Sequence, residues 1–215
     1  RQEILNAERG AKINAKAKFN VDSKASYISS DANALYIGDF AAGKKFRTPD
    51  HHHGKKKKAW IAQYIFDYHT GEPKNTTYEV DGKKVLKPER VIFIRQKVQG
   101  MAVYFKRNAK RFRSRIALSV SFGSKSSKLA IYNNPLDHRG SSFQVKLPGG
   151  HTIPGYVLND HNHIKTIPMP PGSEDLDWDG SNLYTAFEAG ANPYRKRWRD
   201  KGAVIESRFY QLSTP

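Results

Sequence analysis

Alternating apolar and polar positions dominate the middle of the chain, from Trp60 to Tyr156. In AWIAQYIFDYH, residues 59–69, every second residue from Trp60 to Tyr68 falls on one face, as expected of a β-strand. The segment VIFI, residues 91–94, is apolar on both faces, which predicts a central strand covered on both sides. Further strands are predicted at IALSVSF (116–122), KLAIY (128–132) and FQVKL (143–147).

Turn residues separate these segments. Asp81-Gly82 stands between TTYEV and KKVL and predicts a hairpin with a two-residue turn. Gln99-Gly100 predicts a turn through which MAVYF, residues 101–105, pairs with residues 91–94. Pro148-Gly149-Gly150 leads into HTIPGYV. The pattern gives roughly eight to ten short strands, at the spacing of a sandwich or a barrel.

The two ends of the chain lack this regularity. Residues 1–20 are poor in large apolar groups and predict either a frayed arm or an arm that orders on a partner. Residues 41–58 predict an irregular loop punctuated by glycine and proline. After Tyr156 we expect irregular chain, with an acidic loop at 174–179, a short helix at NLYTAFEAG, and a strand or helix at AVIESRFYQL.

The predicted fold is therefore all-β or β-rich α+β: an antiparallel sandwich or barrel with a basic N-terminal arm and long irregular loops. Residues 1–58 form the basic arm and loop region in this prediction. Residues 59–215 form the β-rich domain, with an irregular, proline-rich C-terminal part.

Composition narrows the class of partner. The chain has 215 residues, with 37 Lys and Arg against 20 Asp and Glu, a formal charge of +17. Such a charge points to a polyanion: nucleic acid, anionic lipid or acidic sugar. Cysteine is absent, which excludes disulfides, thiolate zinc sites and a cysteine nucleophile. We find no apolar run long enough to span a membrane and no signal peptide, and localisation stays open.

The basic residues are concentrated. Residues 90–136 contain no Asp or Glu, whereas ordinary solvated faces mix both signs of charge. Phe112 and Trp198 stand among arginines, where an aromatic ring either stacks on a base or anchors the loop. The predicted nucleic-acid contacts are Lys55, Lys56, Lys57, Lys58, Lys106, Arg107, Lys110, Arg111, Arg113, Arg115, Arg195, Lys196, Arg197 and Arg199.

Histidines offer candidates for metal chemistry. Three successive imidazoles, His51 to His53, cannot easily aim at one ion, so a solvated polar loop is the favoured interpretation and no metal is predicted there. A second set could serve a metal-dependent nuclease, because a nuclease needs a base and metal ligands. That set comprises Asp137, His138, His161 and His163, in a stretch where such residues are also common in turns.

In general texture the chain resembles β-rich virion building blocks. The shared features are a basic arm, a cysteine-free β-rich domain, proline-rich excursions and strong positive charge. The resemblance implies a non-enzymatic structural or assembly protein, a component of a virus or phage particle. Its basic surface would contact nucleic acid or an acidic neighbouring subunit, its partners would include copies of itself, and no cofactor is expected. The alternatives are a freestanding nucleic-acid-binding module and a metal-dependent nuclease or toxin.

Overall fold

The computed structural model describes residues 8, 11–12, 18–31, 34–54, 58–67, 69–105, 114–122, 125–137, 142–187 and 210–213. Phe105 and residues 210–213 are described by backbone alone. Two short 3-10 helices, η1 (Asp50–His52) and η3 (Pro148–Gly150), accompany the strands. The strands are β1 (Tyr27–Ser30), β2 (Ala34–Gly38), β3 (Ala59–Ile65), β4 (Thr77–Val80), β5 (Lys83–Leu86), β6 (Arg90–Ile94), β7 (Val98–Phe105), β8 (Ser114–Val120), β9 (Ser127–Asn133), β10 (Phe143–Lys146), β11 (Thr152–Val157), β12 (His163–Met169), β13 (Ser173–Trp178), β14 (Asn182–Phe187) and β15 (Tyr210–Ser213).

These strands form four sheets. The largest has six strands in the order β1-β2-β3-β6-β11-β10, and a second has four in the order β12-β9-β8-β7. A three-stranded sheet, β13-β14-β15, and the β4-β5 hairpin complete the set. Among the described strands, every pairing is antiparallel except that of β11 with β6. The chain is thus all-β, and none of the described sheets closes into a barrel.

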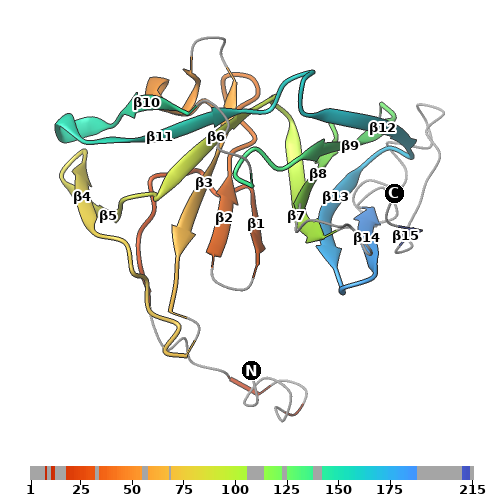
Figure 1. The fold of residues 1–215 in the computed structure, drawn as a ribbon, viewed down its shortest axis with the longest axis horizontal. Helices are drawn as coiled ribbons and strands as arrows, with labels where there is room; N and C mark the ends of the chain where they lie inside the picture. The colour runs from red at the N-terminus through yellow and green to blue at the C-terminus, as the bar shows by residue number, and fades with distance from the viewer. Residues whose placement is uncertain are drawn as a thin grey trace.

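Three hydrophobic clusters lie between the layers. The first contains side chains from both larger sheets, such as Ile61 and Ile92 of the six-stranded sheet and Ile116 and Leu118 of the four-stranded sheet. The second covers the other face of the six-stranded sheet under the β4-β5 hairpin. The third joins the four-stranded sheet to β13 and β14. Figure 1 shows the hairpin and the β13-β14 pair on opposite sides of the two larger sheets.

Several sequence predictions are confirmed. Trp60, Ala62 and Tyr64 share one face of β3 and pack in the second cluster. The segment around Ile92 forms β6, a strand between β3 and β11 that is buried on both faces. Asp81-Gly82 turns β4 into β5, with positive φ at both residues, as a type I′ turn requires.

The predicted turn at Gly100 is wrong. β7 already begins at Val98 and pairs with β8 in the other larger sheet, not with β6. Gly100 lies inside β7, at a register shift, where a Cβ atom would stand 2.5 Å from the Cα of Asp175. The glycine is thus explained by close packing of β13, which the sequence pattern could not reveal.

The chain after Tyr156 is more regular than predicted. The acidic stretch at 174–179 lies mostly in β13, and NLYTAF forms strand β14 where a helix was predicted. At the other end, β1 and β2 occupy residues 27–30 and 34–38 and pair onto β3, within the part that the sequence assigned to arm and loops.

Within the described part of the chain, no helix has the length and apolar character that crossing a membrane requires.

Candidate nucleic-acid interface and a buried histidine cluster

An aromatic and basic surface is built by the loop after β2, the loop between β6 and β7, and the loop after β8. Phe46 and Phe122 are 40% and 52% exposed, and each packs against the buried Phe40, with ring centres 5.1 and 5.9 Å apart. Lys45 Nζ lies 5.6 Å from the centre of the Phe46 ring, and Lys97 Nζ lies 4.5 Å from that of Phe122. Phe40 therefore supports two exposed rings, and each ring has an ammonium group close to it.

A groove continues from this surface. Arg47, which follows Phe46 in the chain, lines a cavity of about 450 Å³ together with His53 and Gly54. Gly54 also lines the neighbouring cavity of about 500 Å³, and that cavity shares Phe143 with a third one of about 420 Å³. We call these three adjoining cavities the Phe143 groove.

Two stacked phenylalanines form the wall of the central cavity. The rings of Phe93 and Phe143 lie 5.8 Å apart at an interplanar angle of 18°. Phe93 is buried, whereas Phe143 is 39% exposed. Gly155 is paired with Phe143 across β10 and β11, and a Cβ atom there would stand 3.1 Å from the Phe143 ring. A Cβ atom at Gly155 would stand closer still to Val145 Cγ2, so the glycine allows the side chains of β10 to pack over β11.

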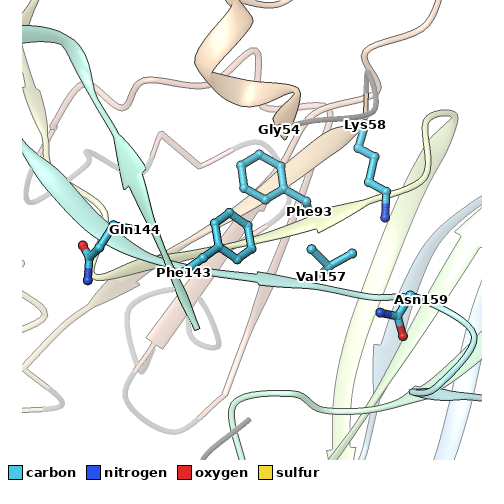
Figure 2. Close-up of a pocket in the computed structure, with 7 residues that line it drawn as sticks. All are labelled: Gly54, Lys58, Phe93, Phe143, Gln144, Val157 and Asn159. Atoms are coloured by element: carbon cyan, nitrogen blue, oxygen red, sulfur yellow. The ribbon is translucent and has the colours of Figure 1, made fainter. Parts of the chain in front are cut away.

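Lys58 supplies charge to the same cavity. Figure 2 shows its side chain directed to the side of the cavity where Val157 and Asn159 lie. Lys55, Lys56 and Lys57 join Gly54 to Lys58 in the sequence and lie outside the described residues. The predicted lysine run is therefore connected at both ends to residues that line the Phe143 groove.

Most of the other predicted nucleic-acid contacts lie outside the described residues. Of the two basic clusters at 106–115 and 195–199, only Arg115 lies within the described part of the chain. Arg115 lies on β8, directly across from Tyr104 of β7. Burial raises the pKa of Tyr104, and the nearby positive charge of Arg115 opposes that rise. The structure thus brings Arg115 to the four-stranded sheet and Lys58 to the groove beside the six-stranded sheet.

The residues of the aromatic and basic surface were not among the predicted nucleic-acid contacts. Lys45, Phe46 and Arg47 are contiguous and were read only as part of an irregular loop. Phe122 was predicted as the last residue of a strand over 116–122, but β8 ends at Val120. An exposed aromatic flanked by basic residues, as in KKFR, was the available signal.

The interpretation of His51 to His53 as a solvated loop is wrong. His52 is 1% exposed and stacks on Trp60, with ring centres 3.7 Å apart. Its Nδ1 lies 2.7 Å from Asp39 Oδ2 and its Nε2 lies 3.1 Å from Asp22 Oδ1. His51 Nε2 lies 2.7 Å from Asp22 Oδ2. These partners are far away in the sequence, so no local sequence pattern predicts the contacts.

Contacts within the buried histidine cluster shift the pKa values of Asp22 and His52. Burial raises the pKa of Asp22, but hydrogen bonds from His51, His52 and Tyr78 outweigh burial, so the net pKa is well below 3.8. Burial lowers the pKa of His52, but its hydrogen bonds to Asp22 and Asp39 and their charges outweigh burial, so the net pKa is above 6.5. Each group therefore favours its charged form in the folded chain.

These pKa shifts predict how the stability of the fold depends on pH, in a sample from which a chelator has removed any metal ions. The contribution of Asp22 is present above pH 3.8 and is lost as pH falls. The contribution of His52 is present below pH 6.5 and is lost as pH rises through its folded pKa. We expect the midpoint of thermal unfolding to be highest between these two values, measured by circular dichroism. In His52→Gln the decline on the alkaline side should shrink, and an unchanged decline would contradict this origin.

The other histidine set does not converge among the described residues. Asp137 accepts hydrogen bonds from the backbone N–H and the hydroxyl of Ser114, at the start of β8. His161 lies in an exposed turn that begins at Asn159, and His163 Nε2 lies 2.9 Å from Thr166 Oγ1. His138 lies outside the described residues. Among the residues described, the metal-compatible group is Asp22, His51 and His52.

Comparison of the chain with protein-family models, curated proteins and solved structures finds no match.

Proposed function

We propose that the chain is a non-enzymatic structural protein of a virus or phage particle that binds single-stranded nucleic acid. The observation that carries the nucleic-acid part is the pair of exposed rings, Phe46 and Phe122, each with a lysine ammonium near it. The Phe143 groove with Lys58 continues that surface. Bases stack on aromatic rings while ammonium groups contact phosphates, and both needs are met within this one region.

Single strands are the form of nucleic acid that suits such a surface. Every base has a flat face that can stack on a phenyl ring, but in a duplex those faces are covered by neighbouring bases. The sequence also contains no zinc-finger spacing or helix-turn-helix pattern that could read a duplex groove. Stacking and phosphate contact carry little base information, so we expect binding that tolerates many sequences.

The assembly part of the proposal has separate support. The two larger sheets share the first hydrophobic cluster, and we take them as the sandwich that the strand spacing predicted. Exposed hydrophobic side chains such as Ile28 on the edge strand β1, together with the net charge of +17, suit a subunit that meets neighbours and a polyanion. An acidic neighbouring surface is the other partner that such charge would attract.

Removing the two exposed rings tests the proposal. For Phe46→Ala/Phe122→Ala we expect binding to a 20-nucleotide single strand to weaken by about 30-fold, because each lost stack is worth about 1 kcal/mol or more. Fluorescence anisotropy with labelled DNA and RNA strands measures the effect. Ile28→Ala removes another exposed hydrophobic side chain and should bind like wild type.

Two outcomes would count against the interface. A double variant that binds as tightly as wild type would show that the rings do not contact bases. A wild-type protein that prefers duplexes over single strands of equal length would show that stacking on unpaired bases is not the mode of binding.

A further inference from the structure

The buried histidine cluster has the arrangement of a metal site. Asp22 comes from the segment before β1, and His51 and His52 come from η1. The three side chains each offer one ligand atom, and these atoms lie within 4.8 Å of one another. We infer that Asp22, His51 and His52 bind a divalent transition-metal ion, with zinc as the expected metal, a property beyond the proposed nucleic-acid binding.

The distances are close to those around a bound ion. The two imidazole Nε2 atoms lie 2.7 and 3.1 Å from the Asp22 carboxylate oxygens. Two ligands that each stand about 2.1 Å from a zinc ion are at most about 4.2 Å apart, and closer at tetrahedral angles. At tetrahedral angles the ligand atoms stand about 3.4 Å apart, so the nitrogen–oxygen distances in the cluster would widen by about 0.3–0.7 Å to admit the ion.

Supporting hydrogen bonds already orient the ligands. His52 Nδ1 lies 2.7 Å from Asp39 Oδ2, so Nδ1–H donates to that carboxylate. Zinc would displace the proton that Nε2 shares with Asp22 and take its place there. Asp39 is held in turn by the Ser23 hydroxyl at 2.6 Å and the Lys24 backbone N–H at 2.8 Å. The Tyr78 hydroxyl donates to Asp22 Oδ2 at 2.6 Å. Carboxylates behind metal-bound histidines fix the ring orientation and tautomer in this way.

The ligand types select the metal. Two imidazoles and one carboxylate, with no sulfur, suit zinc and exclude the soft thiolate sites of copper(I) or iron–sulfur clusters. Calcium and magnesium prefer oxygen ligands alone. His51 is the least buried of the three ligands. Because Asp22 and His52 are nearly fully buried, the site suits a structural ion that ties η1 to the strand layers.

Such an ion would also act near the proposed interface. η1 is followed by His53 and Gly54, which line the Phe143 groove, and then by the lysine run. Metal binding would fix the segment that leads into these residues. The metal site and nucleic-acid binding nevertheless have separate measurements, so either proposal can fail alone.

Metal content is the direct test. Wild-type protein loaded with zinc and dialysed should retain about one ion per chain, measured by inductively coupled plasma mass spectrometry. Zinc should also raise the midpoint of thermal unfolding relative to a chelator-treated sample. His51→Ala should lose the ion and the thermal shift. The matched control is His161→Ala, which removes an exposed histidine from a turn and should keep both.

A second measurement uses the wild-type protein, so its result does not depend on whether the His51→Ala variant folds. Nitrogen-15 NMR of the histidine rings should show that zinc shifts Nε2 of His51 and His52, while Nδ1 of His52 stays protonated. A wild-type protein that retains no zinc would overturn the proposal. So would retention of zinc in folded His51→Ala at the wild-type level, or zinc-induced shifts at other histidines only.

Discussion

Serine in place of Lys55, Lys56, Lys57 and Lys58 is expected to reduce the salt dependence of single-strand binding sharply. Each phosphate neutralised by a lysine contributes about −0.7 to the slope of log K against log salt concentration on a single strand. Four lost contacts would lower the magnitude of the slope by about 2.8. Anisotropy titrations over a series of salt concentrations give the slope for wild type and variant.

The control for this experiment must change the charge equally. Lys83, Lys84, Lys128 and Lys165 are exposed and lie on β5, β9 and β12, and none of them lines the groove. Either fourfold variant carries a formal charge of +13, because four of the +17 charges are removed. Equal slopes in the two variants would show that net charge alone drives binding, and the groove would lose its assigned role.

Replacing Asp39 with alanine is expected to destabilise the fold by about 3–5 kcal/mol. Asp39 is fully buried and accepts hydrogen bonds from Ser23, the Lys24 backbone and His52. Its removal leaves Nδ1 of the buried His52 and the Ser23 hydroxyl without this acceptor, and breaking a buried charged pair from one side carries a cost of this size. Urea unfolding followed by tryptophan fluorescence measures it, because Trp60 stacks on His52.

An exposed aspartate provides the comparison for Asp39→Ala. Asp160 is exposed in the turn before β12, and Asp160→Ala should change the free energy of unfolding by less than about 0.5 kcal/mol. If Asp39→Ala is as mild as Asp160→Ala, the cluster of carboxylates and imidazoles contributes little to stability.

Local chemistry made some elements predictable. The Asp81-Gly82 turn depends on positive φ at two residues, which few residue pairs tolerate, so the sequence alone identified the β4-β5 hairpin. The apolar run at β6 similarly indicated burial on both faces. Strand β13 was missed because it carries Glu174, Asp175 and Asp177, whose charge suggested a loop. Burial of Leu176 against the four-stranded sheet outweighs that local preference.

The candidate sites were harder to predict because they depend on contacts between distant segments. The lysine run stood out by composition, but the ring of Phe143 becomes part of a groove only when β10 pairs with β11 beside β6. His52 meets Asp22 and Asp39 because η1 folds back onto the ends of other segments. A sequence shows three adjacent histidines, and only the tertiary structure supplies the carboxylates that His51 and His52 contact.

The parallel pairing of β11 with β6 has a consequence for synthesis of the chain. Val91 to Phe93 pair with Gly155 to Val157, and the whole of β7, β8 and β9 comes between them in the sequence. One edge of β6 therefore lacks its partner strand while β7, β8 and β9 are being made. An open apolar strand edge invites pairing with another chain, and pairing across such a long separation is slow. The growing polypeptide is therefore most exposed to misassociation in the interval before Val157 leaves the ribosome.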